Sequence, residues 1–257
     1  TIGAAKNGDL LQRVSLSVSS ENFAMVERLY PFRYQFQSIF KPETSQTVLF
    51  ENLKITNKSK KNRHKVALFN LKDRQVQLYS STDKQVSITP AQARYFIDED
   101  DPSALEKQLG LKAKAAPLRQ LETSPIDRLT LLSSIRKQVQ KTERDSHYLV
   151  TNGNALMTYR VQLGNQELIQ LGKNKIKAIK VKIEAFDFVK DKKPASGYVY
   201  AGDASIESSK TASQPSQPDY RHPPVYVWFS VDDRFLPVKF VNHHALGKFV
   251  VELVSEA

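Results

Sequence analysis

Short runs in which apolar and polar residues alternate are the feature that most limits the folds open to this chain. In residues 31–40, PFRYQFQSIF, the aromatic residues Phe32, Tyr34 and Phe36 alternate with polar ones. A period of two places every second side chain on one face of a half-buried β-strand. The same period continues through residues 47–56 and 65–80. Three such runs in succession predict an antiparallel meander.

One segment has helical periodicity instead. In SPIDRLTLLSSIRKQVQK, residues 124–141, apolar residues recur at spacings of three and four. We expect Ser124 as the N-cap, Pro125 as the first helical residue and Asp127 as an acidic third position. These features predict an amphipathic helix. A short second helix is predicted over residues 101–110, with an acidic N-cap and a glycine stop.

Alternation returns after residue 146. Residues 152–154 (NGN) and 164–165 (GN) are typical of tight turns, so we expect hairpins at both places. In residues 173–186 the alternation changes phase near residue 178, which predicts a β-bulge there.

Together these patterns predict a mainly β protein, in which a curved antiparallel sheet or open barrel packs with one amphipathic helix and a short second helix. Residues 1–28 are expected to be an N-terminal extension or a first strand. Residues 29–257 are expected to form a single β-rich domain. Within it, residues 201–224 are rich in Ser and Pro and predict a mobile loop between two strands.

Composition limits the partners and the chemistry. Lys and Arg outnumber Asp and Glu by 38 to 27, and the formal charge of +11 favours anionic partners such as nucleic acid, lipid head groups or acidic polysaccharide. The basic run 57–65 is either an anion-contacting loop or a solvated hairpin loop. Cysteine is absent, which excludes disulfides, thiolate catalysis and Cys-ligated zinc. No run reaches the roughly 18 apolar residues of a transmembrane helix. The N-terminus lacks the apolar core of a signal peptide. If the protein is exported, we therefore expect this sequence to be its mature form, with the signal peptide removed.

Familiar catalytic and metal-binding motifs are missing from the sequence. None of the five histidines pairs with another at the i, i+4 spacing of a helical metal site, and there is no P-loop, G-x-G-x-x-G or G-x-S-x-G. The acidic run 97–101 lacks the spacing of a calcium loop and is expected to mark the start of a helix, with a bound calcium ion as the alternative. We therefore predict no cofactor and no metal.

The segment YVWFSVDDRFLPVKFV, residues 226–241, contains the only tryptophan, Trp228, and the adjacent acids Asp232 and Asp233. The acids are either paired carboxylates of a reacting site or a turn between two strands that Arg234 helps to hold. Because proline cannot donate a ladder hydrogen bond, Pro237 predicts an edge strand or a bulge.

Three segments carry a family resemblance. SPIDRLTLLSSIRKQ, MTYRVQLGNQELIQLGKNKIKAIKVKI and VWFSVDDRFLPVKFV resemble, in this order, segments of the bacterial domain of unknown function 3108 family. The residues taken as its structural signature are Asp127, Gly172, Asp232, Asp233, Arg234 and Pro237. The resemblance implies an exported, mainly antiparallel β protein, often periplasmic, with no established activity.

Three alternative functions are compatible with these features of the sequence. The first is a non-enzymatic envelope protein that binds a lipid, another amphipathic anionic ligand or a protein partner, by analogy with periplasmic lipoprotein carriers. The second is a hydrolase of an envelope polymer that uses acidic residues, and the third is nonspecific nucleic-acid binding through the basic surface. For the first function, the candidate ligand-binding residues are Arg136, Lys180 and Lys182 for an anionic head group and Tyr159 and Trp228 for the apolar part.

Overall fold

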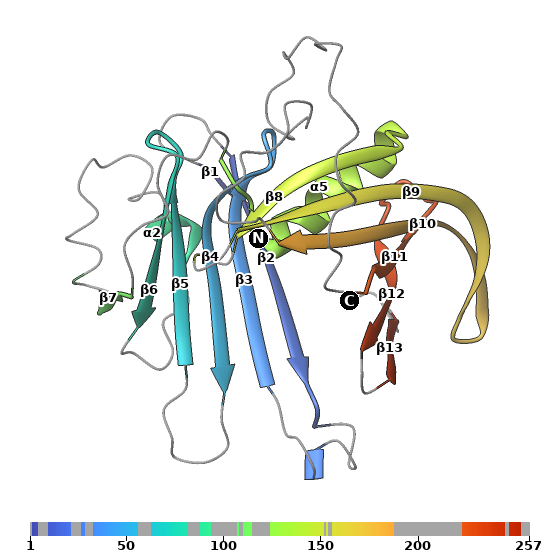
Figure 1. Ribbon diagram of the computed structural model, residues 1–257, viewed down its shortest axis with the longest axis horizontal. Helices are drawn as coiled ribbons and strands as arrows, with labels where there is room; N and C mark the ends of the chain where they lie inside the picture. The colour runs from blue at the N-terminus through green and yellow to red at the C-terminus, as the bar shows by residue number, and fades with distance from the viewer. Residues whose placement is uncertain are drawn as a thin grey trace. The chain divides into compact units, whose positions relative to one another are not determined.

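The chain folds into two compact units, each described by itself below. One unit comprises residues 1–130 with 151–155, and the other comprises residues 131–150 with 156–257. The computed structural model describes residues 2–4, 10–21, 27–28, 33–55, 63–81, 88–93, 107, 110–114, 124–151, 153, 156–187, 223–244 and 247–252. Antiparallel strands dominate both units, which confirms the mainly β class (Figure 1). The single domain expected over residues 29–257 stays a prediction.

The first unit contains a seven-stranded antiparallel sheet whose strands follow one another in chain order, β1 to β7. The predicted meander is confirmed, since each strand pairs with the next along the chain. Two of these strands, β1 and β2, lie within the segment expected to be an extension or a first strand. The bounds are β1 Ile2–Ala4, β2 Leu10–Ser19, β3 Arg33–Lys41, β4 Gln46–Ile55, β5 Arg63–Asn70, β6 Gln75–Ser81 and β7 Leu111–Ala113. A short helix, α2 (Pro90–Ala93), lies between β6 and β7 in the chain.

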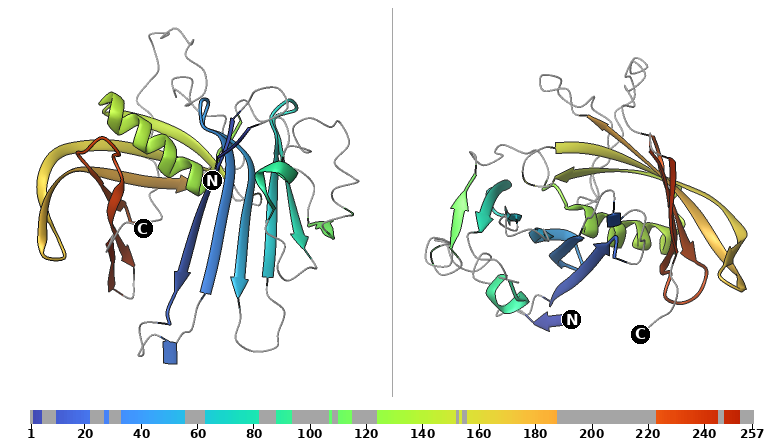
Figure 2. Two further views of the ribbon diagram at one scale, coloured as in Figure 1. Left: turned by 180° about the vertical axis from the view of Figure 1, so that it is seen from behind. Right: turned by 90° about the horizontal axis from the view of Figure 1, so that it is seen from below.

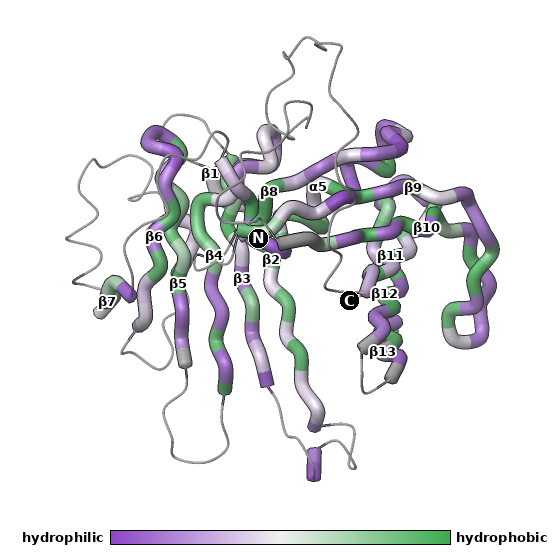
Figure 3. The backbone as a smooth tube through the Cα atoms, in the orientation of Figure 1, coloured by the Kyte–Doolittle hydropathy of each residue, from purple (hydrophilic) through white to green (hydrophobic). Residues whose placement is uncertain are grey.

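The core of this sheet lies toward one end of its central strands. The four residues from Gln37 to Phe40 are buried at the end of β3, and those from Thr47 to Glu51 are buried at the start of β4. In Figure 3 apolar residues of β4 and β5 gather at this end, whereas β5 begins with hydrophilic residues and the far half of β4 mixes hydrophilic with apolar ones. The alternating sequence pattern predicts which side chains share a face of each strand. It does not predict that burial also changes along the length of the strand.

Helix α5 (Arg128–Lys141) begins later than the sequence suggested. The N-cap is Asp127, whose Oδ1 accepts hydrogen bonds from the amides of Leu129 (2.7 Å) and Thr130 (3.2 Å). The prediction of Ser124 as the N-cap is wrong. Asp127 is fully buried, and its Oδ2 accepts from three hydroxyls, those of Ser38 (2.6 Å), Thr47 (2.8 Å) and Thr130 (2.5 Å). The contacts with β3 and β4 fix where the helix starts.

Gly153 occupies a position in the first unit that requires glycine. Its φ is +84°, in the region that side chains rarely adopt. A Cβ placed there would lie 2.9 Å from the Cβ of Ala67 and 3.0 Å from Cδ1 of Leu78. Thus the glycine of the predicted NGN turn meets both a conformational and a packing constraint.

The second unit contains a six-stranded antiparallel sheet in the order β13-β12-β11-β10-β9-β8, and helix α5 runs alongside this sheet (Figure 2). Near the C-terminal end of α5, Gln138 accepts a hydrogen bond from the Tyr148 hydroxyl of β8 (3.2 Å). The bounds are β8 Asp145–Thr151, β9 Leu156–Leu171, β10 Asn174–Asp187, β11 Val225–Ser230, β12 Pro237–His244 and β13 Gly247–Glu252.

Strand β9 is continuous where a turn was expected. The prediction of a hairpin at Gly164-Asn165 is wrong, because these residues lie inside β9. The pairing with β10 shifts register between Ile179 and Val181, so that Gly164 and Asn165 both lie opposite Lys180. A bulge was predicted near residue 178 and is found beside it, with the extra residue in β9.

The signature residues Gly172 and Pro237 have local structural roles. Gly172, with φ of +57°, lies in the turn that joins β9 to β10. Pro237 begins β12, and the register with β11 shifts there, since Trp228 pairs with Lys239 and Phe229 with Pro237. Because β12 has a neighbour on both sides, the bulge explanation for this proline is confirmed and the edge explanation is wrong.

Several predictions fall on residues outside the described ranges. These are the acidic run 97–101, nearly all of the short helix 101–110, and most of the loops 57–65 and 201–224. The end of the basic run is described, and it belongs to strand β5: His64 is buried there, with Nε2 3.4 Å from Oε1 of Glu51.

Candidate functional site

One face of the second sheet combines lysines with large aromatic side chains. In the β10–β11 register, Lys180 lies opposite Trp228 and Lys182 lies opposite Tyr226. Directly opposed residues of an antiparallel pair project to the same side, so these four residues share one face, here called the aromatic–lysine face. The Lys180 ammonium lies 4.5 Å from the centre of the Tyr226 ring and 5.3 Å from that of the Trp228 ring. Both distances are within the range of cation–π attraction.

Trp228 mainly packs against apolar neighbours on this face. Its side chain is 8% exposed and lies in an apolar cluster with Ala178, Val238 and Val241. The indole nitrogen donates a hydrogen bond to the carboxylate of Glu167 on β9. This partner satisfies the polar edge of a ring that is otherwise buried.

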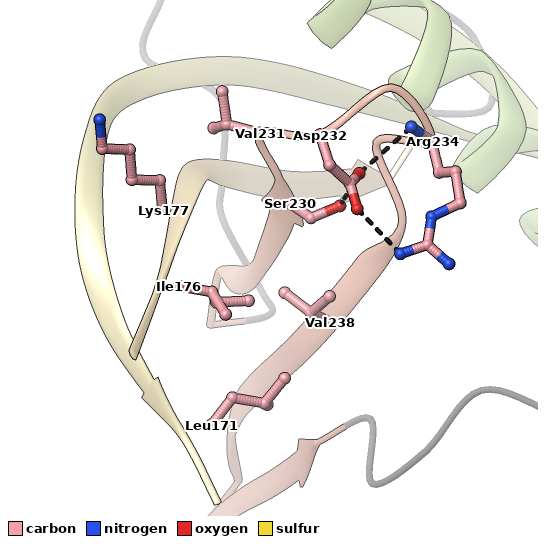
Figure 4. A pocket seen from close by; sticks show the side chains of 8 residues that line it. All are labelled: Leu171, Ile176, Lys177, Ser230, Val231, Asp232, Arg234 and Val238. Atoms are coloured by element: carbon pink, nitrogen blue, oxygen red, sulfur yellow. Dashed lines mark hydrogen bonds and ion pairs between the residues drawn. The ribbon is translucent and has the colours of Figure 1, made fainter. Parts of the chain in front are cut away.

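A pocket of about 350 Å³ adjoins the same apolar cluster. Its apolar side chains include Leu171, Ile176 and Val238, all of which also pack in the cluster that contains Trp228. Polar and charged groups complete the lining (Figure 4). The full lining is Leu171, Ile176, Lys177, Ser230, Val231, Asp232, Arg234 and Val238.

The two acids of the segment 226–241 are part of a turn. Asp232 Oδ1 accepts hydrogen bonds from the Ser230 hydroxyl (2.7 Å) and from the amides of Arg234 (3.2 Å) and Phe235 (3.0 Å). Its Oδ2 pairs with the Arg234 guanidinium at 3.0 Å. Hydrogen bonding by Ser230, with smaller contributions from Arg234 and Phe235, lowers the pKa of Asp232 to about 2. A carboxylate of this kind stays ionised at neutral pH, the opposite of what a general acid needs.

The structure brings together three of the five predicted ligand residues. Lys180, Lys182 and Trp228 share the aromatic–lysine face, although Lys182 also forms an ion pair with Glu184 (2.5 Å). Tyr159 lies opposite Ala185, so it projects from the other face of the sheet. The two residues predicted for the apolar part of a ligand, Tyr159 and Trp228, therefore lie on different faces of the sheet.

The remaining predicted residue, Arg136, lies on α5. Its Nε atom is buried and has no hydrogen-bond partner among the described residues. No contact of Arg136 with the aromatic–lysine face is found within the part of the chain that the structure describes. The signature residue Asp233 is exposed beside Asp232 in the turn.

The pocket residues Leu171, Ile176, Lys177 and Val238 were not expected to act together. They come from three strands, β9, β10 and β12, and no local spacing in the sequence joins them. The signal in the sequence was the change of phase along β10. Ile176 and Ala178 alternate out of phase with the later apolar residues of this strand, and both pack with Trp228. The phase change thus marks a strand with apolar residues on both faces.

The described residues include neither a membrane-spanning helix nor a metal-binding cluster. No helix among them is both long and apolar enough to cross a membrane. The same residues contain no group of three or more His, Cys, Asp or Glu placed to bind a metal ion.

Comparison with known proteins leaves the family open. No family model matches the chain. No curated protein matches it either. A solved structure, described as a beta-barrel-like protein of domain of unknown function DUF1849 from Brucella abortus, is similar at 9% identity and a TM-score of 0.47. That match covers 98% of this chain and 84% of the other. The resemblance to the domain of unknown function 3108 family stays a prediction.

Proposed function

We propose that the second sheet binds an amphipathic anionic ligand, with an apolar part in the pocket and an acidic group beside Arg234 at its rim. The observation that carries this proposal is the pocket itself, whose apolar floor is continuous with the Trp228 cluster and whose lining includes the ion pair of Arg234 with Asp232. Its volume of about 350 Å³ is at the lower end for small-molecule sites. It suits part of an acyl chain rather than a whole lipid.

The energetics favour such a ligand. Each methylene moved from water onto the floor formed by Leu171, Ile176 and Val238 contributes about 0.8 kcal/mol. The exposed Arg234, which also pairs with Asp232, adds a weaker attraction for an acidic group, of about 0.2 to 1 kcal/mol. Affinity should therefore depend mainly on chain length, and charge should adjust it.

The cellular setting of this function is also part of the proposal. The family resemblance supports an exported, periplasmic protein, and the analogy with periplasmic lipoprotein carriers supports a binder. Nonspecific nucleic-acid binding through the net charge of +11 remains a separate prediction, and affinity that collapses with added salt would identify it.

The sole tryptophan provides the test. Titration with decanoate should shift the Trp228 emission, because the indole packs against the floor of the pocket. Decanol, which lacks the charge, should bind a fewfold more weakly, and butyrate should not bind measurably. Isothermal titration calorimetry would give the same affinities without relying on fluorescence.

Two matched pairs of variants locate the site. Leu171→Asn should weaken decanoate binding about tenfold or more, whereas Leu168→Asn, at a residue of the same strand that is 67% exposed, should not. Arg234→Gln should weaken it a fewfold, whereas Lys177→Gln, which changes a side chain on the other face of the sheet, should not. A wild-type protein that binds none of these amphiphiles, or equal losses in the two members of a pair, would overturn the proposal.

A further inference from the structure

The edge strands of the two sheets differ in how they are protected. Unpaired N–H and C=O groups at an edge invite another strand, and natural edges are commonly short, charged or bulged. Among the described strands, β1 and β7 have three residues each, and β8 begins with Asp145, which is paired with Arg160 at 2.7 Å. Strand β13 has none of these protections in its centre. It has six residues and pairs with β12 without a register shift.

The centre of β13 is apolar and exposed. Val250 is 46% exposed and Val251 is 63% exposed. Charged residues, Lys248 and Glu252, flank this centre at equal distances from Val250, and Glu252 also pairs with Lys239 of β12 at 2.6 Å. The strand is therefore self-complementary when it is read in the opposite direction.

We propose that β13 pairs with β13 of a second copy of this chain, antiparallel and about a two-fold axis at Val250. In this register Lys248 lies opposite Glu252 of the second copy, and the reverse pair forms on the other side of the axis. In-register parallel pairing would instead oppose like charges, which is unfavourable. Two-fold symmetry also makes the contact closed, since each edge is used once.

The pairing has a geometric consequence for the second sheet. Val250 lies opposite Val241, and Val241 lies opposite Tyr226, so Val250 is on the side of the aromatic–lysine face. A two-fold axis perpendicular to the sheet places this face of both copies on the same side of one continuous sheet. The proposed dimer does not depend on ligand binding. Its test is therefore independent of the test of the proposed function.

The first test measures mass against concentration by sedimentation equilibrium on the full chain. The wild type should show a reversible monomer–dimer equilibrium. Val250→Lys places two like charges opposite each other at the axis and should raise the dimer Kd about tenfold or more. Leu168→Lys changes another exposed apolar residue, in the β9–β10 hairpin, and should leave the Kd unchanged.

A charge-reversal experiment tests the register. Lys248→Glu alone and Glu252→Lys alone should each weaken self-association, because each opposes like charges across the axis. When the two variants are mixed, each substituted position faces an opposite charge, and a mixed dimer should form. A wild type that remains monomeric at every concentration, a Val250→Lys variant as dimeric as the wild type, or a mixture no more dimeric than its components would overturn the proposal.

Discussion

Asp127 in the first unit and Asp232 in the second use the same local bonding. Each carboxylate accepts hydrogen bonds from the backbone amides two and three residues ahead, Leu129 and Thr130 in one case and Arg234 and Phe235 in the other. In both cases the acid fixes a change of chain direction.

The two acids differ in burial and in the reach of their other partners. Asp127 is fully buried, and its hydroxyl partners Ser38 and Thr47 lie 89 and 80 residues away in the chain. The Asp232 side chain is 41% exposed, and its partners lie within three residues. The same motif therefore joins distant strands to the residues that begin α5 in the first unit, and only shapes a hairpin in the second.

The largest expected effect is the loss of the buried acid. Asp127→Ala leaves two helix amides and three hydroxyls without their acceptor, and we expect the free energy of unfolding to fall by about 3 to 5 kcal/mol. Asp232→Ala removes an exposed turn acid and should cost about 1 kcal/mol. Urea denaturation followed by circular dichroism measures both.

Asp127→Asn is the matched control, because it keeps one acceptor oxygen for the amides and should cost less than the alanine variant. If Asp127→Ala costs no more than Asp232→Ala, burial is not what separates the two acids.

Two glycines extend the comparison. Gly153 and Gly172 both have positive φ, but only at Gly153 do side chains lie within 4 Å of the position that a Cβ would take. Gly172→Ala should cost about 1 to 2 kcal/mol from the backbone alone. Gly153→Ala adds overlap with Ala67 and Leu78 and should cost about 1 to 3 kcal/mol more. Equal losses in thermal or urea unfolding would contradict the role of packing at Gly153.

The sequence predicts what depends on near neighbours. The alternation in β3 to β6, the bulge near residue 178 and the bulge at Pro237 each involve interactions within a few residues, and all three are found. The start of α5 was misplaced because the hydroxyls that hold Asp127 belong to β3 and β4, and no local pattern reveals them.

The pocket and the continuity of β9 were missed for a related reason. Gly164-Asn165 has the composition of a turn, but β10 pairs along β9 on both sides of these residues and keeps the strand extended. The pocket needs three strands in register before Leu171, Ile176 and Val238 meet. Strand pairing, and not residue type, decides both outcomes.

The smallest expected effect is the pH dependence of the exposed acid. Hydrogen bonding by Ser230 is the largest cause that lowers the pKa of Asp232 from 3.8 to about 2. Because the folded pKa lies below the unfolded one, the stabilisation is complete above pH 3.8 and is lost as the pH falls toward about 2. The difference in unfolding free energy between the wild type and Asp232→Asn should therefore be constant above this window and shrink within it.

Urea unfolding at a series of pH values, followed by the fluorescence of Trp228, measures this difference. Asp233→Asn, at the exposed neighbouring acid, is the control and should show no such change. A difference that stays constant down to the lower limit of the window would mean that the Ser230 and Arg234 contacts do not favour the ionised form of Asp232.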